Sequence, residues 1–283
     1  MTVLEALRGA EKRLAAVPDP RLDAEYLLAE TLRLGRLELL LNKQRALTAA
    51  EQGAFEALLA RREKREPLQY ILGSQSFMGF SFKTDPRALI PRFDTEALCE
   101  EALALLRPGD AVLDLCTGTG ALAVALKKLC PQARVTASDV SREALSLARE
   151  NAQALGAEVR FVEGDLFQPL AGERFQGIVS NPPYIPSGLR GRLQPEVEKE
   201  PALALFAGAD GLDFYRRIAK EAPDYLLPGG WLALEIGDGQ GEAVAALLKA
   251  QFEAIRILKD LSGLPRVVSA RLKEGEGHAG SPV

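Results

Sequence analysis

The sequence predicts an α/β protein with a seven-stranded, mostly parallel, doubly wound sheet, preceded by a small helical domain and a β-hairpin linker. Three observations support this prediction. From residue 111 onward, short apolar runs alternate with helical stripes, which is typical of a parallel sheet with crossover helices. A glycine-rich turn follows the first of these runs. Before residue 67, by contrast, the apolar residues show only helical spacing.

Length and composition fit a globular protein of more than one domain. The chain has 283 residues, of which 47% are hydrophobic and 26% charged. The net charge of −4 argues against an extended basic surface for gripping a nucleic-acid duplex, so we expect no stable nucleic-acid binding.

The cysteines and the only histidine limit the possible chemistry. Three cysteines without metal-ligand spacing, and an opening without a signal peptide, predict a cytoplasmic protein. No apolar run approaches the roughly 20 residues that cross a bilayer, so we expect no membrane association. The single histidine, His278, lies in a Gly/Ser-rich tail, residues 274–283, for which we predict disorder. We therefore expect no Ser-His-Asp triad and no histidine-built metal site.

The first 72 residues are assigned to the helical domain. Thr48 and Glu51 have the spacing of a capping box and predict the start of a helix. The basic run at residues 61–65 is interleaved with glutamates, which favours a solvated helix face over a phosphate-binding patch.

Residues 73–92 are predicted to form the hairpin linker, because aromatic residues alternate with polar ones and prolines interrupt the segment. Residues 93–273 then form the main domain. Thr95 is predicted to be the N-cap of its first helix.

The first strand and turn of this domain have the layout of a nucleotide site. Residues 111–115 form an apolar strand, and a helical stripe follows the turn at Leu122, Ala125, Leu126 and Leu129. Asp139 ends the next strand, about 20 residues after the turn, where a carboxylate can accept bonds from two ribose hydroxyls. The turn between the strand and the helix consists of Cys116, Thr117, Gly118, Thr119 and Gly120.

A third strand at residues 159–162 is followed by Asp165. Its carboxylate could accept a hydrogen bond from an adenine amine, with Leu166 or Phe167 against the ring. A structural turn aspartate is an equally good interpretation of the same position.

The segment Asn181-Pro182-Pro183-Tyr184 ends a fourth strand abruptly. Two prolines supply no N–H group, so the carbonyls around them and the Asn181 side-chain oxygen form a cluster of acceptors. Such a cluster suits both hydrogens of a planar NH₂ group, while Tyr184 stacks on the attached π-system. The alternative is a proline turn that merely ends the strand.

The remaining pattern completes the sheet. We expect helices at 211–226 and 241–252, and a strand at 231–236 introduced by a glycine pair. The last two strands, 255–259 and 266–272, have no helix between them and should therefore be antiparallel. In a doubly wound sheet, ligands bind at the carboxyl ends of the strands, where the predicted site residues all fall.

Beyond these patterns, the chain resembles the class I S-adenosylmethionine-dependent methyltransferases, and more closely the release factor glutamine methyltransferases. The likeness covers nearly the whole chain, and the segment 67–96 is among its more specific parts. The motifs that carry it are PLQYILGSQSFMGFSFKTDPRALIPRFDTE (67–96), VLDLCTGTGALAVAL (112–126), NPPYIP (181–186), EPALAL and DGLDFYRRI (within 200–218), GGWLALEIGDGQGEAV (229–244) and KDLSGLPRVV (259–268).

The resemblance implies that the chain transfers the methyl group of S-adenosyl-L-methionine to the glutamine amide in the Gly-Gly-Gln loop of peptide-chain release factors. It assigns residues 116–120 and Asp139 to the cofactor, Leu166 to the adenine pocket and residues 181–184 to the glutamine amide. One departure concerns Cys116, where the family often has glycine. A cysteine keeps the turn if its φ is negative, so we expect cofactor binding to persist.

Three alternatives share parts of this pattern. The acceptor cluster also suits exocyclic amines of DNA or RNA, and the catalytic motifs also fit a glutamine methyltransferase of a ribosomal protein. A non-catalytic binder of the cofactor would not need Asn181 and Tyr184. We favour the release factor as the protein partner and expect the enzyme to be a monomer.

Overall fold

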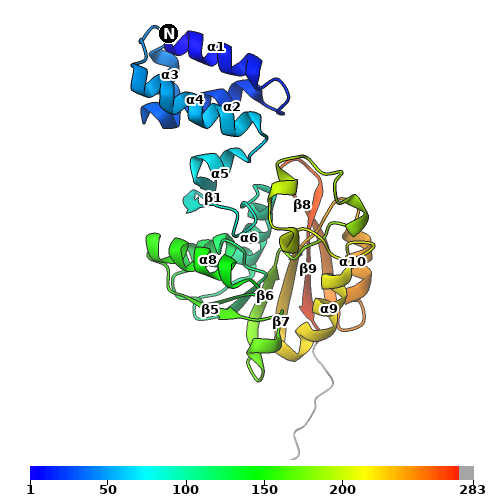
Figure 1. Ribbon diagram of the computed structural model, residues 1–283. Coiled ribbons are helices and arrows are strands. Elements are labelled where there is room, and N and C mark those ends of the chain that lie inside the picture. Colours follow the sequence, from blue (N-terminus) through cyan, green and yellow to red (C-terminus); the bar gives the residue numbers. More distant parts are fainter. Residues whose placement is uncertain (274–283) are drawn as a thin grey trace, which may run out of the picture. The chain divides into compact units, whose positions relative to one another are not determined.

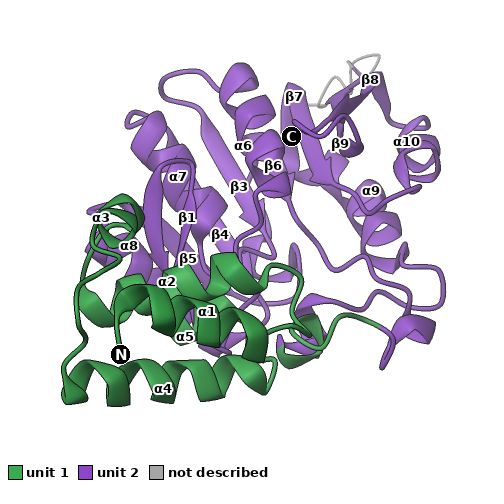
Figure 2. Ribbon diagram, turned by 90° about the horizontal axis from the view of Figure 1, so that it is seen from above, with its two compact units in different colours: residues 1–74, 193–199 green, residues 75–192, 200–283 purple. Residues whose placement is uncertain are grey.

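The computed structural model describes residues 1–273, which form two compact units (Figure 2). Unit 1 contains residues 1–74 and 193–199, and unit 2 contains the other described residues. The return of residues 193–199 to unit 1 is not visible in the sequence pattern. The predicted disordered tail, with His278, lies outside the described residues.

Unit 1 is helical, and its core consists of Leu, Val, Ala, Phe and Ile side chains from all parts of residues 3–71. The predicted capping box is present: Thr48 Oγ1 accepts from the Glu51 N–H, and the Glu51 carboxylate accepts from the Thr48 N–H. The helices are α1 (Val3–Arg13), α2 (Pro20–Leu32), α3 (Arg36–Leu41), α4 (Ala49–Glu63) and α5 (Leu68–Leu72).

The basic run at the end of α4 is only partly solvated, which corrects the sequence-based expectation. The Arg62 side chain is 5% exposed. Its Nε donates to Asp23 Oδ2 (2.6 Å) and its Nη1 to Glu196 Oε1 (2.7 Å). Arg65 also binds Glu196, through Nε and Nη2. The sequence conceals this because both partners lie far from α4 along the chain.

The hairpin predicted between residues 73 and 92 is present as β1 (Ser74–Phe77) and β2 (Phe80–Lys83). The predicted N-cap of the next helix is wrong. Helix α6 (Asp94–Leu105) begins before Thr95, and Phe93, its N-cap, already has helical dihedral angles. Thr95 is therefore inside the first turn, where its side chain is buried.

Within the described residues, unit 2 contains the predicted seven-stranded sheet, in the order β5-β4-β3-β6-β7-β9-β8 (Figure 1). Neighbouring strands are parallel from β5 to β7, and β9 runs antiparallel to both β7 and β8, as expected. The strands are β3 (Ala111–Leu115), β4 (Arg134–Asp139), β5 (Val159–Glu163), β6 (Phe175–Ser180), β7 (Leu226–Glu235), β8 (Phe252–Lys259) and β9 (Pro265–Leu272).

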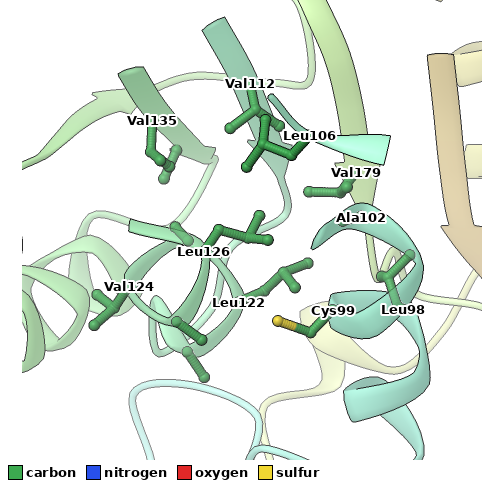
Figure 3. Packing of buried hydrophobic residues seen from close by; sticks show 14 of the residues in the cluster. Leu98, Cys99, Ala102, Leu106, Val112, Leu122, Val124, Leu126, Val135 and Val179 are labelled. Carbon is green, nitrogen blue, oxygen red and sulfur yellow. The ribbon is translucent and has the colours of Figure 1, made fainter. Parts of the chain in front are cut away.

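Helices cover both faces of this sheet. On one face, α6 and α7 pack against Val112, Val135 and Val179 (Figure 3). On the other, α9 and α10 pack against a second set of strand residues that includes Leu113 and Ile178. Alternate residues of one strand thus enter different cores. The helices of unit 2 not yet given are α7 (Ala121–Leu129), α8 (Arg142–Ala154), α9 (Asp213–Tyr225) and α10 (Gly241–Leu248), with short 3₁₀ turns at Gln168–Leu170, Ser187–Leu189 and Ala202–Ala204.

The strand expected after the glycine pair begins earlier, at Leu226, because this residue pairs with Phe175 of β6. A register shift follows on β6 between Phe175 and Gly177. A Cβ atom at Gly177 would lie 2.1 Å from the Trp231 ring, so glycine is required there for the two strands to pack.

Candidate active site

The two loops that carry most of the predicted site residues follow β3 and β6, which lie side by side at the point where the chain reverses its direction across the sheet. From β3 the chain proceeds through β4 to the β5 edge, and β6 then pairs with the opposite side of β3. Loops at such a switch point diverge and leave a crevice outside the carboxyl ends of the strands. The sheet order therefore places the loop from Cys116 and the loop from Asn181 beside one another.

Two cavities lie at this crevice. The larger encloses about 710 Å³ of empty space, part of it open to solvent, and the smaller about 430 Å³. Asn181, Cys116, Gly118 and Leu89 line both. Asn181 thus stands where the two cavities meet.

Most of the predicted residues line these cavities. Asp139, Asp165, Leu166 and Pro183 line the larger cavity, and Thr117 and Thr119 the smaller one. Gly120, Pro182 and Tyr184 do not belong to the lining of either cavity.

The glycine-rich turn at residues 116–120 is fixed by a hydrogen bond to β3 and by close packing against α8. Thr117 Oγ1 donates to the buried Asp114 Oδ2 at 2.6 Å. Burial raises the pKa of Asp114 to about 7, although this hydrogen bond opposes the shift. Gly120 has a φ of +78°, and a Cβ atom there would lie 2.9 Å from Ala148 Cβ. Gly120 thus permits close packing of the turn against α8, which is a structural role.

The condition given for Cys116, a negative φ, is not met, because its φ is +59°. This left-handed conformation is the one that glycine adopts without steric cost, which gives a physical reason for glycine at this position. The cysteine keeps the turn, but with backbone strain.

Asp139 is fixed by backbone donors. Its Oδ2 accepts from the Gly118 N–H (2.9 Å) and its Oδ1 from the Ser141 N–H (2.9 Å). Each carboxylate oxygen keeps capacity for a further donor, as a ribose diol would require. Ser138 also lines the larger cavity, and its buried hydroxyl has no hydrogen-bond partner among residues 1–273. A polar ligand with hydroxyl groups therefore fits this wall better than an apolar one.

Beyond β5, the structure separates the two apolar candidates. Leu166 lines the larger cavity, whereas Phe167 is fully buried in the core and stacks on Tyr225, with ring centroids 4.6 Å apart. Asp165 Oδ2 accepts from Arg217 Nη2 at 2.8 Å, so this carboxylate already has a cationic partner.

The segment after β6 is fixed by several groups. Asn181 Nδ2 donates to Thr95 Oγ1 (3.2 Å), and the Tyr184 hydroxyl donates to Glu235 Oε1 (3.4 Å). Gln240 Nε2 donates to the Tyr184 carbonyl (3.0 Å). Burial raises the pKa of Tyr184 above its usual range, so the phenol stays protonated.

Sequence analysis missed several residues of this site. Thr95 was expected to be a cap, Ser138 precedes the last residue of β4 and belongs to no quoted motif, and Glu235 lies in the quoted motif 229–244 but was given no role. Glu200 was part of a quoted motif without a role. Its carboxylate accepts from the Ile90 N–H (3.0 Å) and pairs with Arg92, so it joins the segment before Pro201 to the cavity wall near Leu89.

Among the described residues, no helix combines the length and apolar character needed to span a bilayer. A larger open groove lies at the opposite strand ends, near Ala111, Arg134 and Val159, and contains none of the predicted site residues.

Comparisons with known proteins agree with this fold. Residues 5–73 match the family model described as PrmC N-terminal domain, and residues 94–191 match the Methyltransferase small domain. Among solved structures, a methyltransferase from Pyrococcus furiosus aligns with a TM-score of 0.53 at 22% identity, over 69% of this chain and 90% of its own. The catalytic domain of hMettl16 aligns with a TM-score of 0.56 at 16% identity, over 77% of this chain and 83% of its own. These two similarities concern the fold.

The protein is an S-adenosylmethionine-dependent methyltransferase. Curated relatives define the family more closely. A release factor glutamine methyltransferase of Geobacter sulfurreducens is 48% identical over 95% of both chains, and one of Moorella thermoacetica is 43% identical over 97% of this chain and all of its own. At this identity and coverage, the chain belongs to the release factor glutamine methyltransferases.

Proposed function

We propose that this chain methylates the side-chain amide nitrogen of the glutamine in the Gly-Gly-Gln loop of peptide-chain release factors, with Asn181 as the group that holds the amide. The observation that carries the proposal is that Asn181 directly follows β6 at the switch point and lines both of the cavities that are assigned below to the cofactor. The family of the nearly full-length relatives supports the substrate.

The larger cavity suits the adenosine part of the cofactor. Asp139 would accept bonds from the ribose hydroxyls, Leu166 would pack against adenine, and Asp165 would accept from the adenine amine. The turn from Cys116 to Gly120, of which Thr117 and Thr119 line the smaller cavity, would hold the rest. When bound, S-adenosylmethionine supplies a methyl group already activated by the sulfonium charge.

The chain's own residues then have mainly to position the acceptor nitrogen. Alignment of this kind is worth up to roughly 7–11 kcal/mol of a reaction barrier. An amide nitrogen is a poor nucleophile because its lone pair is delocalised. Hydrogen bonds from its two N–H groups to Asn181 Oδ1 and the Pro182 carbonyl raise the electron density on the nitrogen and favour the charge that develops there. The proton can leave later to water.

In this arrangement, Pro183 and Tyr184 complete the acceptor pocket, with Tyr184 against the flat face of the amide. The hydrogen bond from its hydroxyl to Glu235 and the bond from Gln240 to its carbonyl limit the motion of this residue.

We further propose that the enzyme acts as a monomer in the cytoplasm, where release factors act, and forms no stable complex with nucleic acid. The net charge of −4 supports the last point.

Transfer of a labelled methyl group tests the proposal. Purified release factor, the same factor with its loop Gln replaced by Ala, and single-stranded and duplex DNA are incubated with the enzyme and labelled cofactor. We expect label on the intact factor only. Label on the Gln→Ala factor would show that the methyl group is transferred to a residue other than the loop Gln. Label on DNA would contradict the proposal that the substrate is a protein.

A further inference from the structure

We propose that Gln240 is a positioning residue for methyl transfer, whose side-chain amide holds Tyr184 in place by joining three loops of unit 2. This inference rests on the proposed function, in which Tyr184 lies against the flat face of the substrate amide. Gln240 belongs to the lining of neither cavity at the site, so it acts on the reaction only through Tyr184.

The three loops come from separate parts of the chain. Tyr184 follows β6, Gly211 precedes α9, and Gly237 lies between β7 and α10. Gln240 is the N-cap residue of α10 and is half-buried. Its Nε2 donates to the Tyr184 carbonyl at 3.0 Å and, in a longer bond of 3.4 Å, to the Gly211 carbonyl. Its Oε1 accepts from the Gly237 N–H at 2.9 Å, so one side chain connects all three loops.

The polarity of these backbone partners fixes the orientation of the Gln240 amide. A backbone carbonyl oxygen can only accept a hydrogen bond, and a backbone N–H can only donate one. The NH₂ end therefore faces the carbonyls of Tyr184 and Gly211, and the oxygen faces Gly237. A flipped amide would lose all of these bonds. A carboxylate of the same shape would place an oxygen against two carbonyl oxygens, so the junction requires an amide.

Two glycines allow these loops to approach Tyr184 and Gln240 closely. A Cβ atom at Gly211, whose φ is +77°, would lie 2.2 Å from the Tyr184 carbonyl oxygen and 2.8 Å from Gln240 Nε2. A Cβ atom at Gly237 would lie 2.8 Å from Gln240 Oε1 and 3.0 Å from Tyr184 Cδ2. A side chain at either position would thus displace its neighbours. Both the ring and the backbone carbonyl of Tyr184 are therefore closely packed at this junction.

The elements that carry the junction are also bound to one another. The buried Tyr215 of α9 donates its hydroxyl hydrogen to the Glu235 carbonyl at the end of β7 (2.8 Å). The next residue, Ile236, donates its N–H to the Arg266 carbonyl of β9 (2.9 Å). The bond from Gln240 to Tyr184 consequently connects the acceptor segment to a part of unit 2 that is held by several other bonds.

Gln240→Met tests the inference, because methionine keeps the length of the side chain and removes its amide. We expect kcat for methyl transfer to the release factor to fall roughly 10²-fold, the typical effect of a small misplacement. The affinity for S-adenosylmethionine, measured by calorimetry, should remain close to wild type, since Gln240 lines neither cavity. A wild-type kcat would overturn the inference, as would a loss of cofactor affinity as large as the loss of kcat.

Gln52→Met is the matched control. Gln52 of α4 is also half-buried, and its Nε2 donates to the Leu47 carbonyl at 3.0 Å. The substitution thus removes a similar hydrogen bond, but within unit 1 and outside both cavities. We expect a wild-type kcat for this variant. An equal fall in kcat for the two variants would contradict a specific role of Gln240.

A second variant, Gln240→Glu, separates the two ends of the amide. At pH 8 its carboxylate can still accept from the Gly237 N–H but cannot donate to the Tyr184 carbonyl. We expect kcat to be at least as low as that of Gln240→Met. A wild-type kcat for Gln240→Glu would show that the bond to Tyr184 is not needed and would overturn the inference.

A double substitution tests the connection to Tyr184. If Gln240 acts through this residue, Gln240→Met combined with Tyr184→Ala should be no slower than Tyr184→Ala alone. Independent, multiplicative losses would contradict the connection. If Tyr184→Ala itself keeps the wild-type rate, the proposed role of Tyr184 fails, and the inference fails with it. The proposed function fails separately if the wild-type enzyme leaves the loop Gln of the release factor unmethylated.

Discussion

At the scale of single residues, the backbone angle φ at Cys116 determines how much a side chain at that position lowers the stability of the fold. A residue other than glycine in the left-handed region costs roughly 1–2 kcal/mol, whereas glycine costs about 0.5–1 kcal/mol through the greater freedom of the unfolded chain. The φ of +59° at Cys116 places this residue among the strained ones.

We therefore expect Cys116→Gly to raise the free energy of unfolding by about 0.5–1 kcal/mol, as measured by urea denaturation. Cys130→Gly is the control, since Cys130 has a φ of −127° and gains nothing from glycine. Its substitution should lower the free energy of unfolding. A loss of stability at both positions would contradict the account of Cys116.

The sequence pattern around Thr95 gives no indication of the contact that this residue makes with Asn181. A threonine before an apolar stripe is a common N-cap, and the helix does begin within one residue of it. What the pattern cannot show is that Phe93 already has helical dihedral angles, which moves Thr95 into the first turn and directs its hydroxyl to Asn181.

At the scale of elements, central strands of unit 2 such as β3 and β6 were well predicted because they are short apolar runs buried on both faces. Errors occur where contacts between residues distant in sequence determine the ends of an element. The pairing of Leu226 with Phe175 extends β7 beyond its glycine pair. The short helices α3 and α5 were not predicted, because about one or two turns give too little periodicity to recognise.

Helix α4 offers a test of such a distant contact. Arg62→Ala would leave the buried carboxylate of Asp23 without its partner, so we expect the free energy of unfolding to fall by about 3–5 kcal/mol. Arg61→Ala, on the same helix, removes an ion pair with Glu66 and a long hydrogen bond to the Tyr70 carbonyl (3.4 Å) from a side chain that is 43% exposed. It should cost less than about 1 kcal/mol in the same urea denaturation experiment. Equal losses of unfolding free energy for the two variants would contradict the larger contribution expected of the buried Arg62–Asp23 pair.

At the scale of the whole molecule, unit 2 buries two carboxyl groups, Asp114 and Glu235, at the strand ends around the site. Burial raises the pKa of each to about 7. The native state thus keeps protons that the unfolded chain loses from about pH 4 upward, because the ordinary values are 3.8 and 4.5. Their contribution to stability is complete below the unfolded pKa and is lost as the pH rises through about 7.

Glu235→Gln removes one of these titrations. Relative to wild type, the variant should gain stability as the pH rises from 4.5 to about 7, by up to about 3 kcal/mol. Urea denaturation of both proteins at pH 5 and pH 8 measures this difference. A difference that does not change with pH would mean that Glu235 titrates in the native state as it does in the unfolded chain.

The sheet order also explains why so much of the site could be predicted. Carboxyl ends of parallel strands meet at one edge, so motifs distant in sequence, at Gly118, Asp139 and Asn181, converge without any knowledge of coordinates. The supporting residues Glu200, Ser138 and Glu235 could not be predicted, since their roles depend on which atoms they face.

The most direct test of the central claim compares Asn181→Ala and Asp139→Ala in one pair of measurements: single-turnover methyl transfer to release factor, and cofactor affinity by calorimetry. We predict that Asn181→Ala loses most of the rate with only a modest loss of affinity, and that Asp139→Ala mainly loses affinity. An unchanged rate for Asn181→Ala would contradict the claim that this side chain holds the acceptor amide. An undiminished cofactor affinity for Asp139→Ala would contradict the proposed contact between Asp139 and the ribose.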